Sequence, residues 1–329
     1  MRLRNIDFGH VFNSSGARGF HGEGYWFHKW VPGLNYEGST FVAKTTTLRP
    51  RKGNMPLGPD GSPIDLFPDC IVVKMAAGVT LNSVGLSGPG AEPLLTRWRK
   101  EAPNDPFVVS FMSVATTSKE RLQEAKEFFG QFATFLRTKG NRPIPGRNVG
   151  LQINFSCPNV GLNTTHLLDE VTATLDESQK LDVATMVKLN ALVSVEAAHL
   201  MTAHAGCDAI VMSNTIPWGQ LPDRIDWKGL FGSETSPIAK YGGGGLSGRP
   251  LLPIVTDWIR KARTMGINKP IVGGGGILSK EDAGRMLDAG ASAIELGSVS
   301  ILRPWRVQGI IRYVNARLST PNLSNSGAN

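Results

Sequence analysis

The 329-residue sequence has few cysteines, no long apolar run and no targeting signal. Its three cysteines, Cys70, Cys157 and Cys207, are too few and too scattered for a disulfide framework, which favours a reducing cytoplasm. No apolar stretch approaches the roughly 20 residues of a membrane-spanning helix. The N-terminal MRLRNIDFGH has two arginines but no apolar core behind them, so it is not a secretory signal. These absences predict a cytoplasmic protein that does not enter a membrane.

Metal-binding motifs and runs of basic residues are also missing. The six histidines join no cysteine or carboxylate cluster, so we expect no metal site. The net charge of +8 and the pI near 9.5 would suit nucleic acid or an anionic substrate. No run of five or more basic residues occurs, however, and charge alone does not distinguish these partners from an ordinary basic surface. We expect no nucleic-acid partner.

Short, nearly continuous apolar segments alternate with amphipathic ones such as Ser118–Leu136, a pattern typical of parallel strands covered by helices. Eight such strands predict a (β/α)8 TIM barrel, and the absence of an early G-x-G-x-x-G disfavours a doubly wound sheet. Arg49–Asp69 and Ile216–Tyr241 are expected to extend over the C-terminal face. Residues 1–318 are expected to form one domain and 319–329 a flexible tail. The expected strands are His10–Gly16, Thr40–Leu48, Pro106–Ser113, Val149–Cys157, Val183–Asn190, Ala209–Thr215, Pro270–Gly276 and Ala293–Ser298.

A run of four glycines lies in IVGGGGI, Ile271–Ile277, at the end of the seventh expected strand. Each glycine loses more backbone entropy on folding than any other residue, so the run calls for a reason. Barrels commonly bind phosphate after their seventh and eighth strands. Backbone N–H groups of Gly275, Gly276, Gly297 and Ser298 would suit a phosphate monoester. The alternative is a glycine-rich turn that only needs positive φ.

Polar residues stand at the ends of several expected strands. A lysine inside a buried strand is costly unless an anion accompanies it, and both Lys44 and Lys188 occupy such positions. With several asparagines they outline a pocket for a planar, anionic, hydrogen-bonding ligand. Cys157, between Ser156 and Pro158, would lie at the same mouth, where the lysines favour its thiolate and an acid–base role. Cys70 and Cys207 are interpreted as buried small hydrophobes.

Nine short motifs occur in an order that resembles the dihydroorotate dehydrogenases, and the class 1 branch in particular, over nearly the whole chain. NFSCPN is similar to the family's catalytic loop, with cysteine where the membrane-bound class 2 enzymes carry serine. The resemblance implies an FMN-containing barrel that oxidises (S)-dihydroorotate to orotate in de novo pyrimidine biosynthesis. The motifs are SSG (Ser14–Gly16), AKT (Ala43–Thr45), LNSVGL (Leu81–Leu86), NFSCPN (Asn154–Asn159), VKL (Val187–Leu189), SNT (Ser213–Thr215), GGLSG (Gly244–Gly248), GGGGI (Gly273–Ile277) and LGS (Leu296–Ser298).

The resemblance also implies roles for individual residues. Cys157 would take the C5 proton as general base while the C6 hydrogen passes as hydride to flavin N5. The two other catalytic residues would be Lys44, which pairs with the substrate carboxylate, and Lys188, which stabilises reduced flavin. The implied FMN-binding residues are Ser15, Lys44, Thr45, Asn154, Lys188, Ser213, Gly248, Gly275, Gly276, Gly297 and Ser298. The implied substrate-binding residues are Lys44, Asn82, Ser83, Val84, Gly85, Leu86, Asn154, Asn159, Asn214 and Thr215.

Four places depart from the family pattern. Ser110 replaces an asparagine, Gln152 a glutamate, and SGPG (Ser87–Gly90) the usual NPG, and HGEGYWFHKW (His21–Trp30) is more aromatic than expected. These departures bear on which substrate is accepted. One alternative is a tRNA-dihydrouridine synthase-like FMN enzyme, disfavoured because Ser156 stands where that family usually has glycine and because the barrel nearly exhausts the chain. A barrel that only binds a phosphorylated metabolite would leave Cys157 without a role. A catalytically inactive homologue is disfavoured by the intact lysines.

The resemblance implies partners as well. Class 1 enzymes pass electrons either to a soluble acceptor such as fumarate or to a second subunit that carries FAD and an iron–sulfur cluster and relays to NAD. The residues Asn214-Thr215 and the GGLSG motif favour the second arrangement slightly. Any cluster would belong to a partner, because three cysteines cannot hold one here. A homodimer is implied by the family alone.

Overall fold

The computed structural model describes residues 1–137, 148–155 and 164–319 of the chain. Cys157 and Asn159 lie outside these ranges, as does nearly all of the expected tail 319–329. The roles predicted for these two residues, and the extent of the single domain, therefore stay predictions.

Eight parallel strands form the central sheet, and each lies within the range predicted for it. Thr40 closes the sheet into a barrel, because its N–H donates to Val11 O (2.7 Å) while its carbonyl accepts from Asn13 N (3.0 Å). The (β/α)8 fold predicted from the sequence is thus confirmed. In order around the sheet the strands are β3 (Val11–Asn13), β14 (Ala293–Leu296), β13 (Ile271–Gly274), β10 (Ala209–Asn214), β9 (Ala184–Asn190), β8 (Val149–Asn154), β7 (Phe107–Phe111) and β4 (Phe41–Val42).

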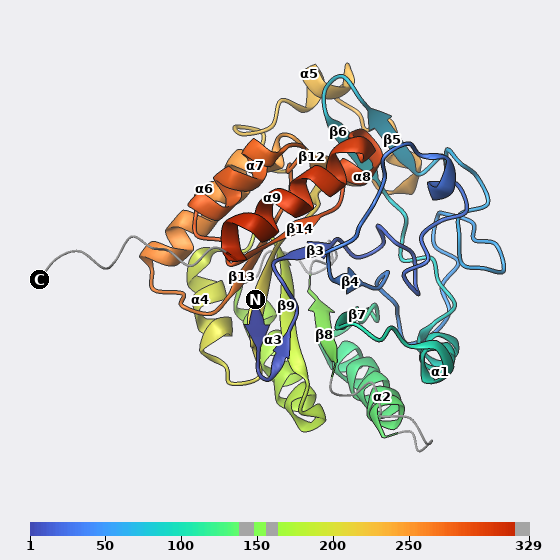
Figure 1. The fold of residues 1–329 in the computed structure, drawn as a ribbon, viewed down its shortest axis with the longest axis vertical. Coiled ribbons are helices and arrows are strands. Elements are labelled where there is room, and N and C mark those ends of the chain that lie inside the picture. Colours follow the sequence, from blue (N-terminus) through green and yellow to red (C-terminus); the bar gives the residue numbers. More distant parts are fainter. Residues whose placement is uncertain (138–147, 156–163, 320–329) are drawn as a thin grey trace, which may run out of the picture.

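Helices cover the outside of the barrel (Figure 1), and local signals in the sequence start several of them. Thr117 and Glu120 form a reciprocal capping box at the start of the helix predicted over Ser118–Leu136. Ser279 caps the next-to-last long helix by accepting from Asp282 N. The α-helices are α1 (Ala91–Glu101), α2 (Ser118–Leu136), α3 (Thr164–Ser178), α4 (Val195–Ala203), α5 (Trp227–Phe231), α6 (Leu251–Thr264), α7 (Lys280–Asp288), α8 (Val299–Leu302) and α9 (Val307–Ser319). Short 3-10 turns are η1 (His28–Trp30), η3 (Gln179–Leu181), η4 (Ala239–Tyr241) and η5 (Pro304–Arg306).

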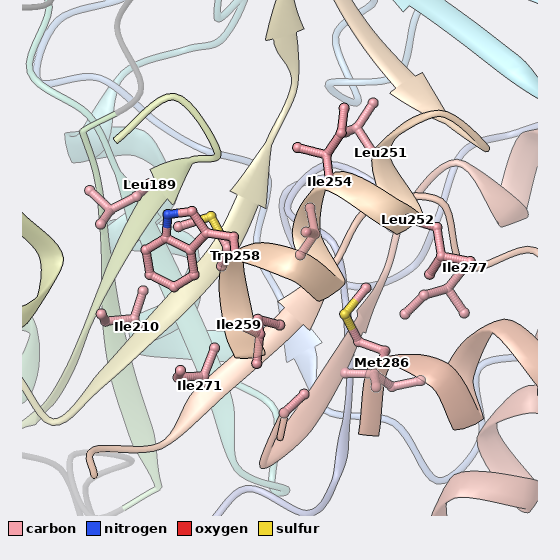
Figure 2. Packing of buried hydrophobic residues seen from close by; sticks show 14 of the residues in the cluster. Leu189, Ile210, Leu251, Leu252, Ile254, Trp258, Ile259, Ile271, Ile277 and Met286 are labelled. Atoms are coloured by element: carbon pink, nitrogen blue, oxygen red, sulfur yellow. The ribbon is translucent and has the colours of Figure 1, made fainter. Parts of the chain in front are cut away.

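The largest apolar cluster lies between the strands and these helices. Trp258 and Ile259 of α6 pack toward Ile210 and Ile271 of the neighbouring strands (Figure 2). Trp258 also donates its indole N–H to Val193 O at 2.7 Å, so the one polar atom of this side chain is satisfied. Burying side chains of this size contributes about 1.5–3 kcal/mol each and fixes the outer helices on the barrel.

A second, antiparallel sheet was not predicted. It contains β11 (Ile216–Pro217), β12 (Gly245–Gly248), β6 (Val79–Asn82) and β5 (Ile71–Lys74), in that order. Figure 1 shows β5 and β6 at the top of the barrel, away from the N-terminus. The sheet joins the connections after β4 and β10 into one structure over the C-terminal face. This agrees with the prediction that long loops extend over that face.

The barrel interior has an apolar part and a polar part. At its lower end, a hairpin of β1 (Arg2–Leu3) and β2 (Ile6–Asp7) brings Met1, Leu3 and Phe8 against apolar strand residues. These strand residues include Phe12, Val42, Val108, Met186, Val211, Val272 and Ala293. Because side chains alternate along a strand, residues two positions further on lie on the same face. They form what we call the polar layer, composed of Lys44, Ser110, Gln152, Lys188, Ser213 and Glu295, all of them buried.

Candidate active site

A chain of hydroxyl and amide groups leads into the polar layer. Ser15 Oγ lies 2.8 Å from Thr45 Oγ1, which in turn lies 2.9 Å from Ser110 Oγ. Gln152 donates its side-chain N–H to Ser110 Oγ at 3.0 Å. The predicted residues Ser15 and Thr45 are therefore brought together. Ser110 and Gln152 fit each other, since the hydroxyl of one accepts from the amide of the other, and both join the same chain of contacts.

Lys44 is buried without an internal anion. Its side chain is 7% exposed, and its ammonium donates to Ser87 O and lies 4.6 Å from the centre of the Phe20 ring. No carboxylate among residues 1–137, 148–155 and 164–319 lies within ion-pair distance of it. Burial alone lowers the pKa of Lys44 from 10.5 to about 8. Such a lysine is ready to bind an anion supplied from outside the protein.

The predicted substrate loop, residues 82–86, follows β6 and comes close to Lys44 through the neighbouring Ser87. Asn54 holds the loop by donating from its backbone N–H to Val84 O (2.9 Å) and from its side chain to Ser83 O (2.8 Å). Ser83 Oγ donates to Tyr241 O at 2.7 Å. The loop is thus fixed between two long excursions of the chain, which places the predicted residues Asn82, Ser83, Val84, Gly85 and Leu86 at the mouth.

The predicted asparagines meet at the ends of β8 and β10. Asn214 donates its side-chain N–H to Asn154 Oδ1 at 3.3 Å, and Thr215 N donates to Asn214 Oδ1 at 2.8 Å. Asn154 stands opposite Lys188 in the β8–β9 register. Ser213, one residue before Asn214, donates its hydroxyl to Asn214 O at 2.6 Å. Three strands therefore direct polar groups of predicted site residues toward one region.

Lys188 has a partner that the sequence analysis missed. Its Nζ lies 2.9 Å from both carboxylate oxygens of Glu295, and the two side chains are only 4% and 3% exposed. The strands that carry them, β9 and β14, are separated in the sheet by β10 and β13, so the pair spans the barrel interior. The signal was present in the sequence: a glutamate inside the apolar strand AIEL requires a buried cation.

The glycines at the ends of β12 and β13 have reasons within the protein. Gly248, Gly275 and Gly276 have φ of +107°, +104° and +76°, which disfavour other residues. A Cβ at Gly276 would lie 2.6 Å from Leu252 N and 2.9 Å from Gly248 O, and one at Gly297 would lie 3.0 Å from Ser14 Cβ. The alternative interpretation, a turn that needs positive φ, is therefore satisfied here. Glycine content alone does not identify a ligand.

The backbone donors at this place point to a ligand more directly. The N–H groups of Gly275, Gly276, Gly297 and Ser298 donate to no acceptor within the described ranges of the chain. They lie where β13 and β14 end, and Ser298 precedes the short helix α8. Uncommitted N–H groups at this position are suited to phosphate oxygens. The donor set fits the phosphate of a bound cofactor or substrate.

Two other features were surveyed across the same residues. No group of three or more histidine, cysteine, aspartate or glutamate side chains in the described parts is arranged to hold a metal ion. None of the helices found there is long and apolar enough to cross a membrane.

Together, a (β/α)8 barrel, a polar layer at its C-terminal mouth and free N–H groups after its last two strands are typical of a barrel enzyme, and the N–H groups are suited to phosphate. The sequence model of the family described as dihydroorotate dehydrogenase matches residues 2–318. Among curated proteins, the catalytic subunit of dihydroorotate dehydrogenase B (NAD(+)) from Streptococcus pneumoniae is 31% identical over 316 residues, covering 92% of this chain and 86% of its own. The corresponding subunit from Cutibacterium acnes is 28% identical over 310 residues, with the same coverage of both chains.

A solved structure supports the same fold. Dihydroorotate dehydrogenase from Eimeria tenella, in complex with ferulenol, superimposes with a TM-score of 0.65 at 19% identity, covering 96% of this chain and 82% of the other. The chain belongs to the dihydroorotate dehydrogenase family, in its class 1 branch. It is accordingly a flavin-dependent oxidoreductase, and the predicted family, fold and enzyme class are confirmed.

Proposed function

We propose that this enzyme oxidises (S)-dihydroorotate to orotate with FMN as its flavin and Cys157 as its general base. The observation that carries the proposal is the buried Lys44, which has no anionic partner among the described residues and contacts Ser87, next to the loop of residues 82–86. A dihydroorotate carboxylate supplies the missing negative charge, and the asparagines supply donors and acceptors for its ring amides. Family membership supports the same substrate.

The residues that would hold FMN fall into two groups. Gly275, Gly276, Gly297 and Ser298 offer their free N–H groups to the phosphate, with Gly248 beside them. The side chains of the barrel interior would contact the ring system: Ser15, Lys44, Thr45, Asn154, Lys188 and Ser213. Bound FMN would supply the hydride acceptor. The donor set fits this cofactor, because it combines phosphate-binding N–H groups with a polar layer that can hydrogen-bond an isoalloxazine.

Substrate binding would centre on Lys44. Burial removes water from its ammonium, so an incoming carboxylate stabilises the positive charge of Lys44. The attraction between the two charges is stronger there than in water, because the dielectric constant is lower. Asn154 and Asn214, already in contact with each other, would read the amide edges of the ring together with Thr215 and the loop residues Asn82, Ser83, Val84, Gly85 and Leu86. Asn159 is proposed to complete this set.

Cys157 follows β8 by three residues and would act from the loop after that strand. Its thiolate Sγ would take the C5 proton of the substrate while Lys44 binds the substrate carboxylate. A placed general base typically contributes about 10²–10⁴ in rate. Lys188 would hold a positive charge near the reduced flavin.

For the electron acceptor we propose a partner subunit that carries FAD and an iron–sulfur cluster and passes electrons to NAD. The relatives from Streptococcus pneumoniae and Cutibacterium acnes are named as catalytic subunits of an NAD(+)-linked enzyme, which supports such a partner. Direct transfer to fumarate is the alternative. A homodimer of the catalytic subunit and a cytoplasmic location complete the proposal.

The test is a visible spectrum of the purified protein, followed by anaerobic addition of dihydroorotate. We expect a flavin spectrum that bleaches, and FMN in the supernatant after denaturation. Cys157→Ala is expected to retain the flavin but to slow bleaching by about 10²–10⁴. A flavin that stays oxidised would contradict the substrate, and normal bleaching of the variant would contradict the base. Protein that stays colourless with FMN supplied would contradict the redox function.

A further inference from the structure

Two ion pairs in the described residues have both side chains less than a tenth exposed. Arg121 and Glu170, 9% and 7% exposed, join α2 to α3 outside the barrel wall. Lys188 and Glu295 lie inside the barrel, in the polar layer. A buried pair on the outside can serve packing alone. One inside the barrel sits on the floor of the mouth where the flavin is proposed to bind.

Glu295 is placed to act on Lys188. Both of its oxygens are equidistant from Nζ, at 2.9 Å, and Lys188 is the only cation within ion-pair distance of it among residues 1–137, 148–155 and 164–319. Gly274 keeps the space beside it open, since a Cβ there would lie 3.3 Å from Glu295 Oε2. The carboxylate therefore fixes where the ammonium stands and cancels most of its charge.

We propose that Glu295 is a positioning residue that holds Lys188 and offsets its charge, and thereby sets the reduction potential of the flavin lower than an unpaired lysine would. This inference rests on the proposed function. Reduced flavin carries a negative charge that a nearby cation stabilises. A lysine paired with a glutamate has no net charge, so it stabilises the negative charge of reduced flavin less than an unpaired lysine does. The reduction potential of the flavin is therefore lower.

The experiment measures the affinity of the FMN-loaded protein for sulfite, and its midpoint potential, in a double-mutant cycle. Sulfite adds reversibly to flavin N5 and leaves a negative charge on the ring, so its affinity reports the same electrostatics without substrate. Glu295→Gln keeps the shape and removes the charge. We expect sulfite to bind at least about tenfold more tightly, which corresponds to about 30 mV for a two-electron couple. Lys188→Met should weaken sulfite binding by a similar factor.

The double variant Lys188→Met/Glu295→Gln is the decisive measurement, and it has no unpaired buried charge to impair folding. If the pair acts as a neutral unit, sulfite affinity returns to within about threefold of the wild type. Glu295→Asp, which keeps the charge, should stay near the wild type. Glu170→Gln breaks the other buried pair and should leave sulfite affinity and potential unchanged, which separates electrostatics from loss of stability.

Several results would overturn the inference. If the double variant binds sulfite as weakly as Lys188→Met, the lysine acts at full charge and Glu295 does not offset it. If Glu295→Gln leaves both readouts unchanged while dihydroorotate still bleaches the flavin, the inference fails and the proposed function stands. Wild-type protein that binds no FMN overturns both together.

Discussion

Two buried lysines in one barrel are handled in opposite ways. Lys188 is joined to Glu295 by two contacts of 2.9 Å. Lys44 follows β4, three strands from β9 in the sheet order, and has a backbone carbonyl and an aromatic ring but no carboxylate within ion-pair distance among the described residues. Burial lowers the pKa of Lys44 to about 8. Of these two buried lysines, one thus has a carboxylate partner and the other has none among the described residues.

The difference indicates that one lysine is suited to binding a ligand and the other to a fixed position beside a cofactor. An uncompensated cation binds an anion strongly, because no internal partner has to be displaced first. A compensated cation holds its place whether or not a ligand is present, and it perturbs a neighbouring cofactor less. Lys44 therefore suits the substrate carboxylate, and Lys188 suits a fixed position beside the flavin.

The largest expected effect comes from breaking the compensated pair. Glu295→Leu should lower the free energy of unfolding by about 3–5 kcal/mol, because it leaves a buried ammonium without an anion. Urea unfolding of the FMN-free protein measures it. Lys188→Met/Glu295→Leu should recover most of the loss, since apolar residues of similar size often replace a buried pair at little cost. Equal losses in the single and double variants would show that packing, not charge, dominates.

Lys44 should respond with the opposite sign. A pKa lowered from 10.5 to about 8 corresponds to about 3 kcal/mol of desolvation at neutral pH, at about 1.4 kcal/mol per unit. Lys44→Met should therefore raise the free energy of unfolding by about 1–3 kcal/mol at pH 7, while orotate binding is lost. Lys100→Met, at an exposed position of α1, should change stability by less than about 0.5 kcal/mol. A destabilised Lys44→Met would mean that Ser87 and Phe20 compensate the lysine fully.

The barrel strands could be predicted from the sequence, but the antiparallel sheet could not. All eight barrel strands were predicted, because each is a short apolar run bounded by glycine, proline or polar residues. The antiparallel sheet was not, because it depends on pairing such as Asn82 with Gly245, far apart in the chain, and β11 has only two residues. Propensity over short windows carries no information about such pairing.

For the site, motifs located Ser15, Lys44, Thr45, Asn154 and Lys188. In the structure Ser15 contacts Thr45, next to Lys44, and Asn154 pairs with Lys188 across two strands. What the sequence could not supply was the pairing of charges. Both lysines were expected to need an anion, but only three-dimensional proximity reveals that Glu295 pairs with Lys188, while no carboxylate in the described parts of the chain pairs with Lys44. The contact between Ser110 and Gln152 is a similar case. These two departures from the family pattern look unrelated in the sequence, but the two side chains are hydrogen-bonded to each other in the structure.

The smallest expected effect is the pH dependence of stability that Lys44 contributes. Its folded-state pKa of about 8 lies below its unfolded value near 10.5, so between these values the unfolded chain binds more protons than the native one. The free energy of unfolding contributed by Lys44 therefore rises as pH increases through this window, by about 1 kcal/mol from pH 7 to pH 9. Urea unfolding at both pH values measures the difference, and comparison with Lys44→Met cancels the contributions of all other groups.

Orotate should reverse the trend, because a bound carboxylate stabilises the ammonium and raises the pKa of Lys44. Above pH 8 orotate binding therefore takes up a proton, and the affinity for orotate falls as pH rises. Lys44 would be shown to be compensated like Lys188 if the wild-type minus Lys44→Met difference were flat with pH without orotate, and if the affinity of the wild type for orotate were equally flat. The two lysines would then not have different roles.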